Sequence, residues 1–281
     1  MTISELISIG SQILKKKNIT THLLDSELLL SKVLKKSREK ILIDYNHRVS
    51  KSAILDFNLL IGRRQKSEPI AHIFEEKEFW SKKFKVNRNT LIPRPETELM
   101  VEKIIKIFKN KQIFILDIGT GSGCILLSIL EELKKGFGIG IDVSKKAIDI
   151  AIENRENFKL RNRTKFFNRS FEQVFNYKFD LIVSNPPYVC SHEIKNLSDD
   201  IRKYEPRLAL DGGNDGLDLI KKVIYKSTSI LKRKGILALE IGFGQYKKVS
   251  QILKLKGFKN RYLIKDYQNN IRCILAELKD R

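Results

Sequence analysis

The chain has 281 residues, 42% of them hydrophobic, and a formal net charge of +21 from 54 basic and 33 acidic residues. This length and composition suffice for one large globular domain or two modest ones. No apolar run approaches the roughly 20 residues that a membrane-spanning helix needs, which argues against a membrane partner. The first residues, with Glu5 and no early arginine, do not follow the pattern of a secretory signal or a transit peptide.

The cysteine and histidine content bears on the compartment and on metal chemistry. Three cysteines, far apart and odd in number, argue against a disulfide framework and for a reducing compartment. The four histidines show no metal-ligand spacing with each other or with the cysteines, so we expect no bound metal. Together these features predict a cytoplasmic protein.

The positive charge has two interpretations. It could serve an anionic partner such as nucleic acid, or it could reflect a composition biased toward lysine, isoleucine and asparagine. The basic residues are spread along the chain, without an arginine-rich arm or an alternation of basic and aromatic residues. The second interpretation is favoured, and we expect no specific binding of nucleic acid.

The first 70 or so residues show the periodicity of helices. Apolar residues recur at helical spacing over residues 6–14 and 23–34, and a third such segment covers residues 50–64. Thr2, with Glu5 three places later, resembles a capping box. Glu68-Pro69 is expected to end the helical part. We predict a small helical domain over residues 1–72, for partner binding, substrate positioning or structural support.

A short connecting segment follows. The segments Phe79-Trp80 and Phe84-Lys85-Val86 predict two short strands, and hence a β-hairpin linker over residues 73–92. Pro93 and Pro95 then impose an extended approach. The acidic residues after them suit the positive end of a helix that runs to about Phe108.

From about residue 113, short apolar runs alternate with helix-like stretches. The expected strands are residues 113–116, 138–141, 165–167, 179–184 and 235–241, with helices at 124–133 and 145–157. Strands that are apolar on both faces and separated by helices form a parallel sheet with both sides covered. Two final strands, 260–265 and 271–278, are expected to close one edge as an antiparallel pair. The fold class is therefore α/β, with this domain spanning residues 93–281.

A glycine-rich loop, DIGTGSG at residues 117–123, follows the first parallel strand and opens a helix. Glycine lets the backbone approach a ligand closely. The loop lacks the lysine of a P-loop and the G-x-G-x-x-G spacing of dinucleotide sites. Asp142, at the end of the next strand, suits the two hydroxyls of a ribose. Loop and acid together predict a site for NAD(P) or S-adenosylmethionine, the alternative being a purely structural turn.

The segment NPPY, residues 185–188, follows the fourth strand at the same edge of the sheet. It offers hydrogen-bond acceptors but no acid or base for hydride transfer, which favours a methyl donor over NAD(P). The side-chain oxygen of Asn185 and the carbonyl of Pro186 can each accept one N–H of a planar amide or adenine amino group. Pro187 helps to hold that carbonyl still, and Tyr188 can lie against the planar group. The alternative is a simple turn that ends the strand.

These residues resemble the protein-(glutamine-N5) methyltransferase family, and most closely the members that act on peptide chain release factors. The resemblance covers nearly the whole chain and depends on EPIA (68–71), EFW (78–80), LIPRPETE (91–98), the glycine loop, NPPY, YEPR (204–207) and ALDGG (209–213). NPPY alone is shared with adenine-N6 methyltransferases, whereas its combination with LIPRPETE is much more specific. A sister group that acts on a ribosomal protein differs after the Ile-Pro-Arg.

The resemblance implies a helical N-terminal domain, a hairpin linker and a seven-stranded, Rossmann-like class I methyltransferase domain. It implies S-adenosylmethionine as the methyl donor and the glutamine of the Gly-Gly-Gln loop of class I release factors as the substrate. The implied cofactor-binding residues are Gly119, Thr120, Gly121, Ser122 and Gly123 for the methionine end, Asp142 for the ribose, Phe171 for the adenine, and Asn185. The implied substrate-binding residues are Asn185, Pro186, Pro187 and Tyr188, of which Asn185, Pro186 and Tyr188 act in catalysis.

Two positions depart from the family pattern. Glu75 stands in the hairpin region where the family often has glycine, and Ser170 stands before Phe171 where an acidic residue is common. Three alternatives remain: a ribosomal-protein glutamine N5-methyltransferase, a nucleic-acid adenine-N6 methyltransferase and a non-catalytic adaptor. The adenine enzymes normally need a region that recognises and flips the target base, and no such insertion is visible.

Overall fold

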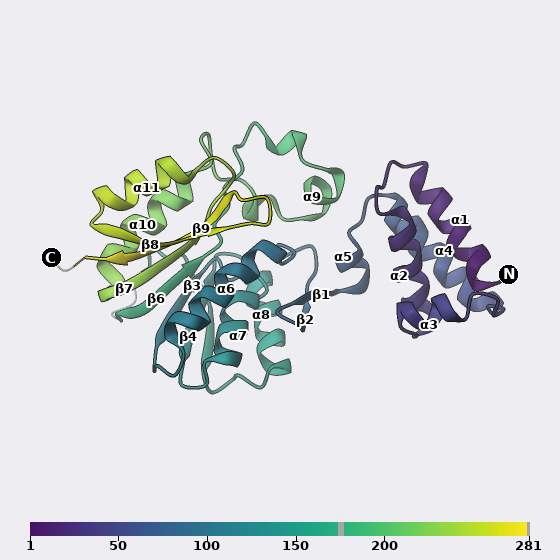
Figure 1. Ribbon diagram of the computed structural model, residues 1–281, viewed down its shortest axis with the longest axis horizontal. Helices are drawn as coiled ribbons and strands as arrows, with labels where there is room; N and C mark the ends of the chain where they lie inside the picture. Colours follow the sequence, from purple (N-terminus) through teal and green to yellow (C-terminus); the bar gives the residue numbers. More distant parts are fainter. Residues whose placement is uncertain (174–176, 280–281) are drawn as a thin grey trace. The chain divides into compact units, whose positions relative to one another are not determined.

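The computed structural model describes residues 1–173 and 177–279 and divides the chain into two compact units (Figure 1). The first unit comprises Met1–Glu76 and Ser198–Tyr204, and the second comprises Lys77–Leu197 and Glu205–Arg281. Within the described ranges, none of the helices combines the length and the apolar character needed to cross a membrane.

The first unit is helical. Its helices are α1 (Ile3–Lys15), α2 (His22–Leu34), α3 (Arg38–Ile43), α4 (Lys51–Gln65), α5 (Ile70–Phe74) and α9 (Asp199–Tyr204). The predicted capping box is confirmed, because the Thr2 hydroxyl accepts the N–H of Glu5 while the Glu5 carboxylate accepts the N–H of Thr2. Three segments were expected to be helical, but the short α3, α5 and α9 were not. The expectation that Glu68-Pro69 ends the helical part was wrong, because Pro69 is the N-cap of α5.

The predicted hairpin consists of β1 (Glu76–Phe79) and β2 (Lys82–Lys85). Its two turn residues, Trp80 and Ser81, have φ of +53° and +52°, the backbone twist that matches two-residue hairpins. The Trp80 backbone N–H donates to the Glu98 carboxylate, and its indole N–H donates to Glu132. The tip of the hairpin is thus held by polar contacts to the two helices that follow it.

In the described part of the chain, seven strands form one sheet in the order β5-β4-β3-β6-β7-β9-β8. They are β3 (Phe114–Ile118), β4 (Phe137–Asp142), β5 (Thr164–Asn168), β6 (Phe179–Ser184), β7 (Leu231–Glu240), β8 (Phe258–Lys265) and β9 (Ile271–Leu278). The first five are parallel, whereas β9 runs antiparallel to both β7 and β8. The predicted α/β class and the antiparallel closing pair are confirmed.

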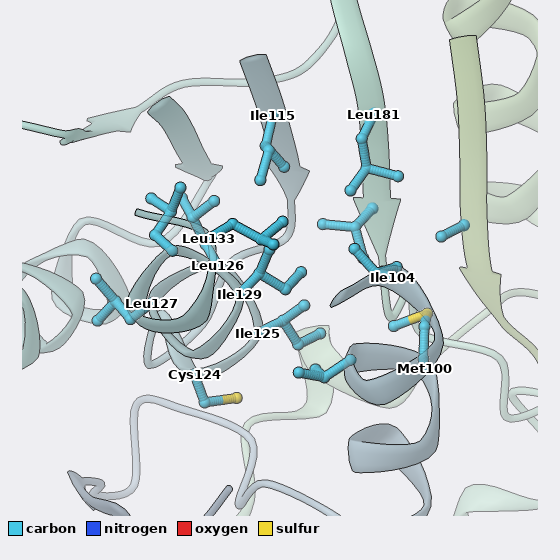
Figure 2. Packing of buried hydrophobic residues seen from close by; sticks show 14 of the residues in the cluster. Met100, Ile104, Ile115, Cys124, Ile125, Leu126, Leu127, Ile129, Leu133 and Leu181 are labelled. Carbon is cyan, nitrogen blue, oxygen red and sulfur yellow. The ribbon is translucent and has the colours of Figure 1, made fainter. Parts of the chain in front are cut away.

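Helices cover both faces of this sheet (Figure 1). Each face has its own apolar core. One face is covered by α6 (Pro95–Phe108), α7 (Cys124–Glu132) and α8 (Lys145–Asn157), the other by α10 (Asp218–Ile230) and α11 (Tyr246–Leu255). Figure 2 shows Met100 and Ile104 of α6, with Ile125 and Ile129 of α7, gathered below Ile115 and Leu181 of β3 and β6. Neither α10 nor α11 was among the helices expected from the sequence.

The topology determines where a ligand can bind. From β3 the chain proceeds outward through β4 to β5, and it then returns to the other side of β3 to form β6. In open α/β sheets the crevice beyond the carboxyl ends of the strands, at such a reversal, is the usual binding site. The glycine loop follows β3, and NPPY follows β6.

Candidate active site

A cavity of about 620 Å³ opens at the carboxyl ends of β3, β4 and β6, entirely within the second unit. Of the site residues expected from the sequence, the cavity is lined by Gly119, Thr120, Gly121, Ser122, Asp142, Phe171, Asn185 and Pro187. Gly123, Pro186 and Tyr188 are not among its lining residues. Segments that lie as far as 68 residues apart in the sequence, from Gly119 to Pro187, thus meet at one cavity, as expected for one site.

The glycine loop is held in place by the neighbouring strand. The N–H groups of Gly119 and Thr120 both donate to the carbonyl of Ile141, at 2.9 and 3.0 Å. Gly123 differs from the other loop glycines, because it caps α7 with φ +80° and a Cβ there would lie 3.1 Å from the Phe166 ring. This glycine therefore allows α7 to start close to the sheet and provides no cavity wall.

Beneath the loop, Asn154 of α8 connects it to the hairpin. The fully buried Asn154 amide donates to the carbonyls of Ser122 and Lys85, at 2.8 and 3.0 Å. Its oxygen accepts the N–H of Lys85 at 2.8 Å. One side chain thus satisfies backbone groups of β2 and of the glycine loop together.

The Asp142 carboxylate is oriented by the backbone on both sides. It accepts the N–H of Gly121 at 3.0 Å through one oxygen and the N–H of Ser144 at 2.9 Å through the other. Burial raises the pKa of this carboxyl above its usual value, while the backbone donors oppose the shift. Each carboxylate oxygen has a second acceptor position, so the pair of oxygens suits a ribose diol.

A second acid, Asp117, lies under the loop and is completely buried. The Thr120 hydroxyl donates to its Oδ2 at 2.7 Å, and within the described residues Oδ1 has no hydrogen-bond partner. Burial raises the pKa of Asp117 to about 7, an effect only partly offset by Thr120. A group that titrates near neutral pH therefore supports the glycine loop.

Val189, the residue after NPPY, forms a short strand-like bridge with residues 210–212. The N–H of Val189 donates to the carbonyl of Leu210, and the N–H of Gly212 donates to the carbonyl of Val189 at 2.8 Å. A Cβ on Gly212 would lie 2.8 Å from the carbonyl oxygen of Pro187, so only glycine allows this approach. The ALDGG segment therefore packs against the proline pair and restrains it.

The LIPRPETE segment forms part of the cavity wall, although none of its residues was predicted as a site residue from the sequence. The Arg94 guanidinium pairs with the buried Glu205 carboxylate at 2.5 Å, and the same carboxylate accepts the N–H of Ile92 at 3.2 Å. Arg94, Thr97 and Leu208 line the cavity. The motifs LIPRPETE and YEPR marked these regions, but no spacing rule indicated that they face one another.

Comparison with known proteins identifies the family. Residues 5–74 match the family model described as PrmC N-terminal domain, and residues 109–241 match a model described as methyltransferase domain. The chain is 36% identical over 265 residues to the release factor glutamine methyltransferase of Caulobacter vibrioides, covering 94% of this chain and 92% of that one. It is 38% identical over 278 residues to the enzyme of the same name from Buchnera aphidicola, covering 99% of each. The chain belongs to the release factor glutamine methyltransferase family.

A solved structure supports the fold. A methyltransferase from Pyrococcus furiosus aligns with a TM-score of 0.52 at 19% identity, covering 70% of this chain and 89% of that one. The resemblance stated from the sequence is thus confirmed for the family, for the α/β methyltransferase fold and for the enzyme class. The adaptor alternative is thereby set aside.

Release factor glutamine methyltransferases use S-adenosylmethionine, and the cavity suits it. Its volume lies within the range of small-molecule sites. It combines a glycine loop, a carboxylate with free acceptor positions and an aromatic side chain, Phe171, that packs partly buried against the second core. Ser170, which replaces the more common acid, accepts the N–H of Glu172 at 3.3 Å and so supports the turn that carries Phe171.

Proposed function

We propose that this chain transfers a methyl group from S-adenosylmethionine to the side-chain amide nitrogen of the glutamine in the Gly-Gly-Gln motif of class I release factors. The modification would modulate translation termination in the cytoplasm. The observation that carries the proposal is the position of Asn185, which directly follows β6 and lines the same cavity as the glycine loop and Asp142. The reaction requires hydrogen-bond acceptors for the two N–H groups of the substrate amide, beside the site that holds the methyl donor.

We assign the cofactor to the glycine loop, Asp142 and Phe171. The loop would hold the methionine end, Asp142 the ribose and Phe171 the adenine. When bound, S-adenosylmethionine supplies an electrophilic methyl group on a sulfonium sulfur. The role of the chain itself is to bring one amide nitrogen to that methyl and to keep it there.

The amide nitrogen is a weak nucleophile because its lone pair is delocalised, as the rotation barrier of about 18–20 kcal/mol indicates. Asn185 and the Pro186 carbonyl would each accept one of its N–H groups and stabilise the positive charge that develops. A single hydrogen bond contributes only about 1 kcal/mol net, so these bonds do not cancel the resonance. Positioning can lower the barrier by roughly 7–11 kcal/mol. This is the role we give to NPPY, residues 185–188, which we call the clamp and which its two prolines stiffen.

The N-terminal helical domain, which we place at residues 1–72, would dock the release factor, with residues 73–92 as linker and 93–281 as catalytic domain. Leu55 and Leu59, four residues apart on α4, are 65% and 69% exposed. Residues at this spacing share one face of a helix. Replacing both with serine should weaken methylation of the full release factor and leave a short Gly-Gly-Gln peptide unaffected. Equal losses on both substrates would contradict a docking role.

Mass spectrometry tests the substrate directly. The protein and S-adenosylmethionine are mixed with an unmethylated release factor, and in parallel with ribosomal protein and with DNA, because NPPY is shared with other methyltransferases. One added methyl mapped to the Gly-Gly-Gln glutamine is the expected result. Methylation of ribosomal protein or of DNA adenine, with the release factor untouched, would overturn the substrate and leave the cofactor assignment standing.

A further inference from the structure

Glu240 is a buried acid to which the proposed reaction gives no role. It ends β7, pairs with Cys273 of β9 in the sheet and is 1% exposed. Removing a carboxylate from water is costly unless its partners compensate. Burial raises the pKa of Glu240, whereas Thr97 and Arg272 oppose that shift. An apolar residue at this position would fill the core without that cost. We therefore expect the role of Glu240 to lie in its polar contacts.

The two carboxylate oxygens of Glu240 face two different motifs. Oε2 accepts a hydrogen bond from the Thr97 hydroxyl at 2.5 Å, and Oε1 lies 3.4 Å from the Tyr188 hydroxyl oxygen. Thr97 belongs to LIPRPETE, is 2% exposed and lines the cavity. Tyr188 is the last residue of NPPY. A single carboxylate therefore connects the segment that forms one wall of the cavity to the clamp that follows β6.

Tyr188 is held from other directions as well. The Arg272 guanidinium carbon lies 5.8 Å from the centre of the Tyr188 ring, within the range of cation–π contacts. The Tyr188 carbonyl accepts the Gln245 amide at 3.0 Å. A Cβ on Gly242 would lie 3.1 Å from the ring carbon Cδ2. These contacts restrain the backbone and one ring face, whereas the hydroxyl at the far end of the ring faces Glu240.

We propose that Glu240, braced by Thr97, is a positioning residue that sets the tilt of the Tyr188 ring against the substrate amide. This inference rests on the proposed function and adds to it the expectation from the sequence that the Tyr188 ring lies against the planar amide of the glutamine. At 3.4 Å the contact is longer than an ordinary O–H···O hydrogen bond. Hydrogen bonds in an active site can shorten in the complex with substrate. Glu240 itself touches neither substrate nor cofactor in this assignment.

Three substitutions separate positioning from packing. Glu240→Gln keeps the size and one acceptor, and Thr97→Val removes the brace isosterically. Loss of one such hydrogen bond should lower kcat about five- to tenfold, with the cofactor Kd unchanged. Thr164→Val is the matched control, because Thr164 is 2% exposed at the start of β5 and its hydroxyl has no hydrogen-bond partner in the described residues. We expect it to leave kcat unchanged.

The Tyr188→Phe background makes the test specific. If Glu240 acts through the Tyr188 hydroxyl, Glu240→Gln should lower kcat in the wild type and have almost no further effect in Tyr188→Phe. An equal loss in both backgrounds, or an equal loss from Thr164→Val, would overturn the proposal. Glu240→Gln keeps the volume of the buried side chain, so the cycle does not depend on a variant that leaves a cavity.

A spectroscopic measurement keeps the inference independent of the substrate. The chain has eight tyrosines, and Tyr188→Phe identifies the Tyr188 signal in protein labelled with ¹³C at the tyrosine Cζ. Glu240→Gln and Thr97→Val should both shift that signal, whereas Thr164→Val should not. An unmoved signal would overturn the positioning role. If the wild type methylates no glutamine while the signal shifts as expected, the proposed function fails and the Glu240–Tyr188 contact stands.

Discussion

The backbone N–H of Gly121 donates to the carboxylate of Asp142 across 3.0 Å, which joins the glycine loop after β3 to the end of β4. The acid that we assign to the ribose is therefore also the acid that fixes the loop. Because the same oxygens serve both purposes, a change at Asp142 affects the loop conformation and the ribose contacts together.

Asp142→Asn should weaken cofactor binding. An asparagine side chain presents one acceptor and an NH₂ group, which cannot accept both backbone N–H groups. Hydrogen bonds to a charged group contribute about 1.5–3 kcal/mol, so we expect the S-adenosylmethionine Kd to rise roughly 10- to 100-fold. Isothermal titration calorimetry measures it. Asp149→Asn, an exposed acid on α8, is the control, and an unchanged Kd in Asp142→Asn would refute the ribose assignment.

Asp117 makes stability depend on pH. Burial raises the pKa of Asp117 from 3.8 to about 7, so between these values the folded chain binds more protons than the unfolded chain. The free energy of unfolding therefore falls as pH rises through this window. From about pH 5 to about pH 8 the loss due to Asp117 is roughly 2–3 kcal/mol.

Urea unfolding of the wild type and of Asp117→Asn at the two pH values isolates this loss. The pKa values of Asp142 and Glu240 are also raised by burial, but both groups are present in both proteins. We expect the variant to lose clearly less stability than the wild type on going to high pH. Parallel losses would show that Asp117 is not the group that titrates.

Glu75 is the departure from the family pattern that the structure explains. It caps α5 in the left-handed region with φ +56°, where a side chain is strained and glycine is not. Glu75→Gly should raise the free energy of unfolding by about 1 kcal/mol, measured by urea unfolding with circular dichroism. Glu76→Gly, one residue later at the start of β1, should lower it, since glycine weakens an extended strand. Destabilisation by both substitutions would contradict the strain at Glu75.

The reaction as proposed needs no general base, because the methylated nitrogen is acidic enough to lose its proton to water afterwards. We expect kcat, measured at saturating cofactor, to be flat near neutral pH. Asp117, whose pKa is raised by burial to about 7, provides the control. A steep rise near pH 7 that persists in Asp117→Asn would indicate a catalytic base and contradict this mechanism.

Periodicity and turn chemistry predicted most of the architecture, because each rule acts within a few residues. The alternation of apolar runs and helical stretches predicted the parallel sheet, and Thr2 with Glu5 predicted the first helix start. The short helices were not predicted, because α3 and α9 have 6 residues each, too few for a 3.6-residue repeat to show. Pro69 was interpreted as a stop, although proline is equally suited to the start of a helix, where α5 uses it.

The site residues also fall into those that a local pattern could place and those that it could not. The glycine loop, Asp142 and Asn185 could be placed because each lies at the end of a strand, and parallel strands end at one edge. The Thr97–Glu240 contact joins residues 143 positions apart, and the Tyr188–Glu240 contact joins residues 52 apart. No local pattern contains such information, since it depends on which strands become neighbours and on the side chains that point between them.

Asn185, which the family resemblance places beside both the cofactor and the substrate, is proposed to act mainly by positioning the substrate amide. The most direct measurement compares methyl transfer and S-adenosylmethionine binding in Asn185→Ala and in the wild type. We predict that transfer to the release-factor glutamine falls by about 100-fold or more, because two to three hydrogen-bond and positioning contributions are lost, while the cofactor Kd stays within about twofold. Unchanged turnover in Asn185→Ala would contradict the clamp.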